Sequence, residues 1–278
     1  MAIILDGARC AAELKAELRG AAAWFPRKPG LAAIIVGDDP ASKIYVRNKG
    51  RDCGDCGFYF EDYTLGANTT QLELLSCIRR CNENDKIDGI LVQLPLPETL
   101  HTMGALGAIY ASKDVDCFTA ANIGYMAWGC ANFLPCTPAG IMYLLRQYNI
   151  PIAGKHCVIV GRSNIVGKPL AHLMLTADAT VTVCHSKTQE LAQLTCQADI
   201  LVAAVGRTNF ITREMVKPGA VVIDVGMNRD AKGKLCGDVH FEEVKEIASA
   251  ITPVPGGVGP MTRAMLMTNV FRATQRRL

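Results

Sequence analysis

The chain has 278 residues, of which 50% are hydrophobic and 20% charged, with a net charge of +3. This length accommodates two modest domains or one large one. The net charge is too small to indicate binding to nucleic acid or to a membrane surface. The chain lacks the run of about 18 apolar residues that a membrane span needs. Asp6 also interrupts the apolar start before a signal peptide could develop. We therefore expect a cytoplasmic protein.

In the first half of the chain, strand and helix patterns alternate. The patterns predict helices over 8–23, from Ser42 onward and over 70–82, strands over 31–36, 58–63 and 88–94, and a turn at 37–40. Such alternation is typical of a parallel sheet flanked by helices.

Two polar side chains share one face of the helix that begins at Ser42. Tyr45 and Lys49 are four residues apart, and Gln93 lies near the end of the strand 88–94, where open α/β sheets place ligands. A lysine beside a tyrosine is usually a surface charge with a packed stem. If Lys49 is instead buried at a cleft, its ammonium pKa falls and it can exchange protons near neutral pH. Gln93 could then orient it without changing its charge. The residues alone leave both interpretations open.

The second half repeats the alternation. The patterns predict helices over 139–148 and 261–276, strands over 157–160, 179–184, 199–205 and 220–225, and a rigid glycine-rich loop at 252–260. The segment 113–116 follows a short helix and has loop character.

A glycine-rich turn follows the strand 157–160. Gly161 permits a tight turn, and Gly167 lets a phosphate or a neighbouring strand approach closely. We expect the helix after it to offer free N–H groups and a partial positive charge to a pyrophosphate. Ser163 occupies the middle glycine position of the standard G-x-G-x-x-G pattern, so the motif by itself is weak. An ordinary βα turn is the alternative.

The next strand ends without an acidic residue. Dinucleotide folds that bind NAD usually place Asp or Glu here to hold the ribose hydroxyls. A carboxylate would repel a 2′-phosphate, whereas Arg162, Ser186 and Lys187 would attract one. The sequence therefore predicts NADP as the cofactor. A solvated loop edge with a stray basic residue is the alternative.

The chain contains twelve cysteines. Most lie in apolar or mixed runs, where a cytosolic thiol behaves as a small core residue; these include Cys10, Cys77, Cys157, Cys184 and Cys196. The pairs Cys53/Cys56 and Cys77/Cys81 have spacings that could form a zinc site. Both pairs fall within helical patterns rather than knuckle loops, so we expect no metal.

Several segments together resemble the bifunctional methylenetetrahydrofolate dehydrogenase/cyclohydrolase family, FolD. The resemblance covers essentially the whole chain, and its proline- and glycine-rich segments are specific. The segments are Tyr45 with Lys49, Val92–Pro97, Lys113–Asp116, Pro135–Pro138, Gly161–Pro169, Gly237–Val239 and Thr252–Thr262.

The resemblance implies an α/β fold of two domains, each with a mostly parallel sheet flanked by helices. The first, at 1–138, would bind folate and be joined by the final helix at about 261–278. The second, at 139–260, would be Rossmann-like and bind NADP. The active site would lie in the cleft between them, and the protein would form a homodimer through the cofactor domain.

The resemblance also implies two reactions on tetrahydrofolate derivatives. A hydride passes from 5,10-methylenetetrahydrofolate to NADP, and water then opens the methenyl product to 10-formyltetrahydrofolate. The implied catalytic set is Lys49, Tyr45 and Gln93. Lys49 would act in hydrolysis, Gln93 would hold and tune it, and Tyr45 would pack beside the folate.

Binding roles follow in the same way. Asp116 would hydrogen-bond the pterin, the alternative being a capping or loop aspartate. The segment 253–259 would line the floor between the two sites, with Pro255, Gly256 and Gly257 contacting substrate. The implied cofactor-binding residues are Gly161, Arg162, Ser163, Ile165, Val166, Gly167, His185, Ser186 and Thr188.

One position departs from the family pattern. Cys117 stands where the family commonly has glycine after Lys-Asp-Val-Asp, and a positive φ there would strain a cysteine. Two other functions stay open at this stage: a dehydrogenase of the shikimate type, and a nucleotide-sensing module without catalysis.

Overall fold

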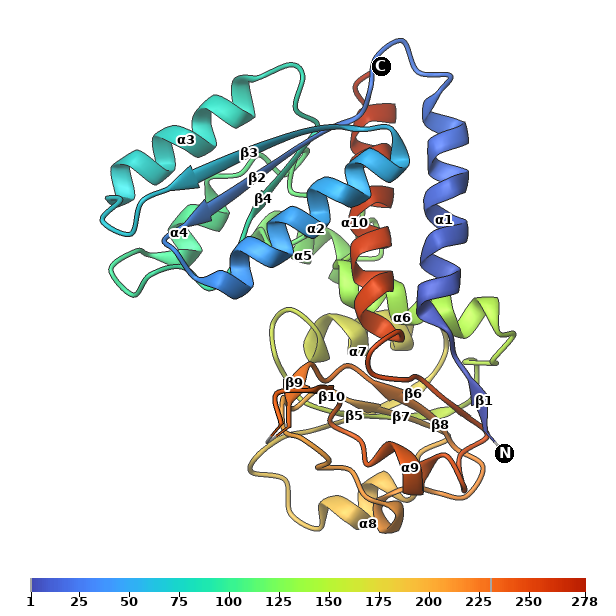
Figure 1. Cartoon of the computed structure of the whole chain (residues 1–278). Helices are drawn as coiled ribbons and strands as arrows, with labels where there is room; N and C mark the ends of the chain where they lie inside the picture. The colour runs from blue at the N-terminus through green and yellow to red at the C-terminus, as the bar shows by residue number, and fades with distance from the viewer. Residues whose placement is uncertain (1, 231) are drawn as a thin grey trace. The chain divides into compact units, whose positions relative to one another are not determined.

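The computed structural model describes residues 2–230 and 232–278, which form two compact units (Figure 1). Unit 1 comprises Met1–Ala11 and Cys136–Thr262, and unit 2 comprises Ala12–Pro135 and Arg263–Leu278. Two helices have residues in both units: α1 (Gly7–Ala22) and α10 (Val258–Gln275).

Unit 2 is built on a three-stranded parallel sheet in the order β3-β2-β4. Its strands are β2 (Gly30–Val36), β3 (Tyr59–Leu65) and β4 (Gly89–Val92). All seven residues of the central strand β2 are buried, as expected for a parallel strand covered on both faces. The helices that lie wholly in this unit are α2 (Pro40–Cys56), α3 (Gln71–Glu83), α4 (Thr102–Gly107) and α5 (Ala120–Ala127).

Side-chain caps mark the starts of α2 and α3 in unit 2. The Asp39 side chain accepts the N–H of Ser42 at 2.7 Å, and Pro40 occupies the first helical position. An acidic cap followed by proline is a strong start signal, so α2 begins two residues before the predicted start at Ser42. Thr70 and Glu73 form a capping box at the start of α3.

Unit 1 contains a six-stranded parallel sheet in the order β1-β11-β8-β7-β5-β6. The strands are β1 (Ile3–Ile4), β5 (His156–Val160), β6 (Thr180–Cys184), β7 (Ile200–Ala203), β8 (Val221–Asp224) and β11 (Ala250–Ile251). The chain runs from β5 to β6 on one side, and β7 then pairs with β5 on the other side. This reversal makes the ends of β5 and β7 a topological switch point, where open α/β sheets bind ligands.

Short elements complete unit 1. They are α6 (Cys136–Gln147), α7 (Gly167–Thr176), α8 (Leu191–Thr195), α9 (Phe241–Val244), the 3₁₀ helix η1 (Arg213–Met215), and the antiparallel pair β9 (Asn228–Arg229) and β10 (Leu235–Cys236).

The N-terminal segment lies in a different unit from the one expected. The predicted first domain included all of 1–138, but Ile3 and Ile4 pair with Ala250 and Ile251 at the edge of the unit 1 sheet. Strand pairing over two residues leaves no periodic signal in the sequence, which is why the assignment of this segment was wrong.

The cysteines follow the prediction with one exception. Cys10, Cys77, Cys157 and Cys184 are buried, whereas Cys196 is partly exposed and donates its Sγ–H to the Glu214 carbonyl at 2.9 Å. All twelve cysteines lie in the described part of the chain, and none of them forms a disulfide. Within 2–230 and 232–278, no three His, Cys, Asp or Glu side chains gather as a metal site would require. Nor does any helix of these residues have the length and apolarity to cross a membrane.

A buried carboxylate connects three parts of unit 2. Asp88 is fully buried and accepts hydrogen bonds from Arg27 at 2.6 and 2.7 Å, from Arg277 at 2.9 Å and from the Gly30 N–H at 3.0 Å. Burial alone would raise the pKa of Asp88, but the hydrogen bonds from Arg27 and Gly30 outweigh it and hold the pKa below its ordinary value. The carboxylate thus stabilises the fold above a pH of about 4, and this contribution is lost as the pH falls through the lowered pKa.

We predict that Asp88→Asn lowers the free energy of unfolding at pH 7 by about 2–3 kcal/mol, because Arg27, Arg277 and the buried Gly30 N–H lose their charged acceptor. Urea unfolding followed by circular dichroism measures this. Asp85→Asn is the control, since Asp85 contacts the same Arg277 but is fully exposed. The gap between parent and Asp88→Asn should narrow as the pH falls below about 4; an equal loss in both variants would contradict this role of Asp88.

Candidate active site

Unit 2 brings together the three residues predicted for catalysis. Tyr45 and Lys49 lie one turn apart on α2, and Gln93 follows β4 directly. Lys49 Nζ donates to Gln93 Oε1 at 3.0 Å. The Gln93 amide nitrogen donates to the Leu94 carbonyl at 2.7 Å, so the amide oxygen is the atom that faces the lysine. Both side chains are half-buried, and Tyr45 is 37% exposed.

A buried acid on the same helix fixes α2 in unit 2. Asp52 lies three residues after Lys49 and is 2% exposed. One of its carboxylate oxygens accepts from Lys15 on α1 at 2.9 Å, and the other lies 3.2 Å from an Arg263 nitrogen on α10. These ion pairs hold the helix that carries Lys49 against two neighbours. The sequence analysis missed Asp52, because an aspartate in a helical run has no local signature of burial.

The Lys-Asp-Val-Asp segment divides into structural and accessible residues. Lys113 is 3% exposed and donates to the Cys81 and Asn84 carbonyls, while burial lowers its pKa to about 8. Asp114 is buried and accepts from the Phe118 and Thr119 N–H groups at 3.0 and 2.8 Å. Asp116 remains half-buried. Of the two aspartates, Asp116 is therefore the one that can reach a ligand.

Cys117 has a positive φ, the conformation that would be expected of the glycine commonly found at this position in the family. Its φ is +61° and its side chain is fully buried. The thiol donates to the Phe133 carbonyl at 3.5 Å. A left-handed conformation at a non-glycine residue is unfavourable, and burial with a hydrogen bond offsets part of that cost.

The turn after β5 in unit 1 depends on close backbone approaches. Gly161 has φ +130°, and a side chain there would collide with the Ala204 carbonyl. A side chain at Gly167 would collide with the Gly161 carbonyl. Glycine at 167 therefore makes room for the turn itself, and the predicted close approach of a phosphate there stays a prediction.

The N–H groups that start α7 are not free, contrary to expectation. Ser163 Oγ accepts the N–H groups of Val166 and Gly167 at 3.1 and 3.5 Å, and the Ser163 carbonyl accepts that of Lys168. Pro169 has no N–H. By contrast, within the described chain the N–H groups of residues 162–165 make no hydrogen bond with the protein. An anion at this turn would thus meet the N–H groups of residues 162–165, rather than those of the helix.

The loop after β6 lies beside this turn. Val160 and Cys184 are paired at the ends of β5 and β6, so the segments that follow are neighbours. The loop is closed by the His185 N–H, which donates to Thr188 Oγ1 at 2.8 Å, and by the Thr188 N–H, which donates to the His185 carbonyl. The side chains of Arg162, Ile165 and Ser186 are exposed, whereas Val166 is buried.

The predicted glycine-rich loop adjoins the start of α1 in unit 1. The Ala8 N–H donates to the Gly256 carbonyl at 2.9 Å, and a side chain at Gly7 would collide with the Gly257 carbonyl. Gly256 has φ +107°, which favours glycine, and Pro255 is exposed. Of the three predicted substrate-contacting residues, Gly257 is buried.

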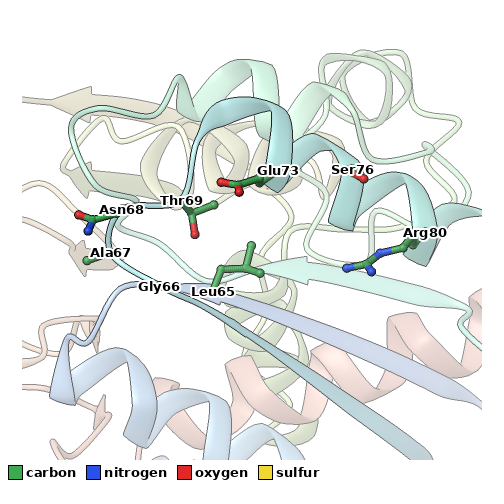
Figure 2. A pocket seen from close by; sticks show the side chains of 8 residues that line it. All are labelled: Leu65, Gly66, Ala67, Asn68, Thr69, Glu73, Ser76 and Arg80. Carbon is green, nitrogen blue, oxygen red and sulfur yellow. The ribbon is translucent and has the colours of Figure 1, made fainter.

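A pocket of about 510 Å³ lies in unit 2, beyond the end of β3 (Figure 2). It is lined by Leu65, Gly66, Ala67, Asn68, Thr69, Glu73, Ser76 and Arg80. No residue that the sequence predicts for catalysis or binding belongs to this lining. The Glu73 carboxylate is occupied by the capping box with Thr70.

Unit 1 has a parallel sheet with a glycine turn at its switch point. Unit 2 has a second parallel sheet, beside which Lys49 of α2 pairs with Gln93. Together these features define a two-domain nucleotide-dependent enzyme. Family models agree with this class. The model for the tetrahydrofolate dehydrogenase/cyclohydrolase NAD(P)-binding domain matches residues 135–278, and that for the catalytic domain matches residues 5–116.

Individual relatives extend over nearly the whole chain. The bifunctional protein FolD of Ruminiclostridium cellulolyticum is 53% identical over 97% of this chain and 96% of its own length. The crystal structure of bifunctional FolD from Campylobacter jejuni has a TM-score of 0.99 at 48% identity, with full coverage of both chains. FolD from Trypanosoma brucei, complexed with NADP cofactor and inhibitor, has a TM-score of 0.95 at 38% identity, covering 99% of this chain and 98% of its own.

The chain therefore belongs to the tetrahydrofolate dehydrogenase/cyclohydrolase family, FolD. The predicted family and fold class are confirmed. Shikimate 5-dehydrogenase from Thermus thermophilus has a TM-score of 0.53 at 15% identity, covering 89% of this chain and 100% of its own, and shares the fold alone.

Proposed function

We infer that the chain is a bifunctional enzyme of one-carbon folate metabolism whose hydrolytic chemistry depends on Lys49. The enzyme oxidises 5,10-methylenetetrahydrofolate to 5,10-methenyltetrahydrofolate with NADP, and hydrolyses the product to 10-formyltetrahydrofolate. The observation that carries the assignment of Lys49 is its 3.0 Å hydrogen bond to Gln93.

The two reactions place different demands on the protein. In the first, a hydride leaves the carbon that bridges two folate nitrogens and reduces the nicotinamide. The resulting cation is delocalised over both nitrogens, so this step needs alignment rather than an acid or a base. In the second, water attacks the cation and the ring opens, which requires protons to be moved.

Lys49 is suited to moving those protons. Its ammonium faces a neutral amide, and a neutral partner orients the group without the strong rise in pKa that a carboxylate would cause. In this proposal Lys49 is the catalytic group of hydrolysis, and Gln93 is its positioning residue. Tyr45, one turn away on the same helix, packs beside the folate, and half-buried Asp116 hydrogen-bonds the pterin.

The cofactor turn is suited to NADP. Exposed Arg162 and Ser186 follow paired strand ends, and Lys187 extends the same loop. These groups would hold the 2′-phosphate, while the N–H groups of residues 162–165 would receive other phosphate oxygens. We further propose that the enzyme is a cytoplasmic homodimer formed through unit 1, as the family resemblance implies. A sensing module without catalysis would instead show no turnover of methylenetetrahydrofolate.

We predict that Lys49→Met lowers the rate of methenyltetrahydrofolate hydrolysis by a factor of about 100 or more, the usual contribution of a positioned acid or base. Hydride transfer to NADP should remain appreciable, because it needs no proton transfer. Both rates can be followed in one spectrophotometric assay at the NADPH and methenyl absorbances. Lys43→Met is the matched control, since Lys43 lies on the same helix, is exposed, and pairs with exposed Asp38. Unchanged hydrolysis in Lys49→Met would refute the assignment.

We also predict that Ser186→Asp raises the KM for NADP about tenfold or more and changes the KM for NAD little, because a carboxylate near a phosphate is repulsive. Steady-state kinetics with each nucleotide measure this. Thr180→Asp places the same charge at the exposed opposite end of β6 and is the control. If the parent enzyme used NAD as well as NADP, or if both variants behaved alike, the proposed phosphate site would be wrong.

A further inference from the structure

The segment that follows β7, residues 204–207, lies at the switch point of the unit 1 sheet. Its first residue, Ala204, is so close to Gly161 that any side chain at Gly161 would collide with it. The segment thus forms one wall of the turn proposed to bind phosphate. A dinucleotide at such a sheet places its adenosine ribose at the second strand, here β6, and extends across the switch point. Its nicotinamide half would then lie on the β7 side.

One buried carboxylate holds this segment by its backbone. Asp238 is fully buried. Its Oδ2 accepts the N–H groups of Val205 at 2.6 Å and Gly206 at 3.0 Å, and its Oδ1 accepts that of Arg207 at 2.9 Å. Asn228 donates to Oδ1 as well, at 2.8 Å. Each oxygen therefore receives two donors, and three of the four come from consecutive residues of the segment after β7.

A second carboxylate holds Asp238 in turn. Asp224, at the end of β8, accepts the N–H groups of Asp238 and Val239 at 2.9 and 3.0 Å. Glycine at 237 is needed here, because a side chain would collide with the Asp224 carboxylate. The Asp224 N–H donates to Thr252 Oγ1 at 2.7 Å, so the same arrangement reaches the start of the glycine-rich loop 252–260.

Burial raises the pKa of Asp224 to about 6, although backbone donors oppose the rise and the nearby Asp238 charge adds to it. Placing two carboxylates close together in a buried region lowers the stability of the fold. Such arrangements are more frequent where function requires them.

We propose that Asp238 is a positioning residue for hydride transfer: by binding three consecutive N–H groups, it fixes the segment 204–207 in the shape that receives the nicotinamide half of NADP. Asp224 supports it from behind. The inference rests on NADP use by unit 1, and it adds a residue outside the predicted cofactor set. It also accounts for the Gly237-Asp-Val segment, to which the sequence analysis gave no role.

Asp238→Asn tests the proposal. Asparagine has the same shape, but its NH₂ group would face two of the four donors whichever way the amide points. The segment 204–207 should then relax, and we expect the dissociation constant and KM for NADP to rise about tenfold or more, the effect of a buried donor left unpaired. Hydrolysis of added methenyltetrahydrofolate, assayed without NADP, should stay within about twofold of the parent, because it uses Lys49 of unit 2.

Asp199→Asn is the matched control. Asp199 lies at the opposite end of β7, where it accepts the His156 N–H at 3.0 Å and pairs with Lys217. Its replacement removes a partly buried, hydrogen-bonded carboxylate from the same unit, so it should lower the melting temperature and leave NADP affinity unchanged.

Asn228→Ala removes one donor from Asp238 without changing the carboxylate, and should weaken NADP binding in the same direction but less. This variant keeps the test decisive if Asp238→Asn does not fold. Parental NADP affinity in a folded Asp238→Asn, or in Asn228→Ala when the first variant is unfolded, would overturn the proposal. Equal loss of NADP affinity in Asp199→Asn would overturn it too, because it would mark a general effect of destabilisation. The hydrolysis rate of Lys49→Met tests the proposed function separately. Failure of this inference and failure of the proposed function are therefore distinguishable.

Discussion

In unit 2, the lysine ammonium of α2 donates to an amide oxygen at the end of β4, and the proposed hydrolytic chemistry depends on this contact. The amide is itself held by the Leu94 carbonyl, so its oxygen cannot turn away from the lysine without losing that bond. A carboxylate in the same place would raise the pKa of Lys49 and oppose proton exchange, whereas an apolar residue would leave the lysine undirected. Asp52, three residues further along α2, fixes the helix through Lys15 and Arg263.

In unit 1, the features that matter for the proposed cofactor site are backbone contacts between loops. Parallel strands end at one edge of the sheet, so β5, β6 and β7 deliver three successive loops to the same place. Glycine at 161 lets the loop after β5 approach the loop after β7 closely. Thr188 closes the loop after β6, and the Asp238 carboxylate accepts N–H groups of the loop after β7. The side chains exposed there include Arg162 and Ser186, which the proposed function assigns to the 2′-phosphate.

The sequence was most informative where local chemistry decides the structure. The alternation of strands and helices predicted two parallel sheets, and the spacing of Tyr45 and Lys49 predicted one helix face. Lys49 and Gln93 are 44 residues apart in the chain. Their proximity could be predicted only because both lie where parallel α/β units place functional side chains. The family resemblance, rather than periodicity, supplied the reactions.

What the sequence did not reveal depends on contacts between distant residues. Residues 3 and 4 join a sheet whose partners are about 250 positions away in the chain, and no local pattern encodes such a pairing. The helix after Gly167 was expected to offer N–H groups, but Ser163 satisfies them first. Asp224 at the end of a strand and Asp238 in a loop carry no local sign of burial, and only the fold surrounds them with backbone donors.

The central claim is that Lys49, oriented by its hydrogen bond to the neutral amide of Gln93, serves hydrolysis and not hydride transfer. The most direct test is the pH dependence of both activities in Gln93→Glu, measured on the same preparation as the parent. A carboxylate beside the ammonium raises its pKa, so the ionisation that controls hydrolysis should move to higher pH while the profile of hydride transfer stays unchanged. A hydrolysis profile that does not move, or a hydride-transfer profile that moves with it, would contradict the account.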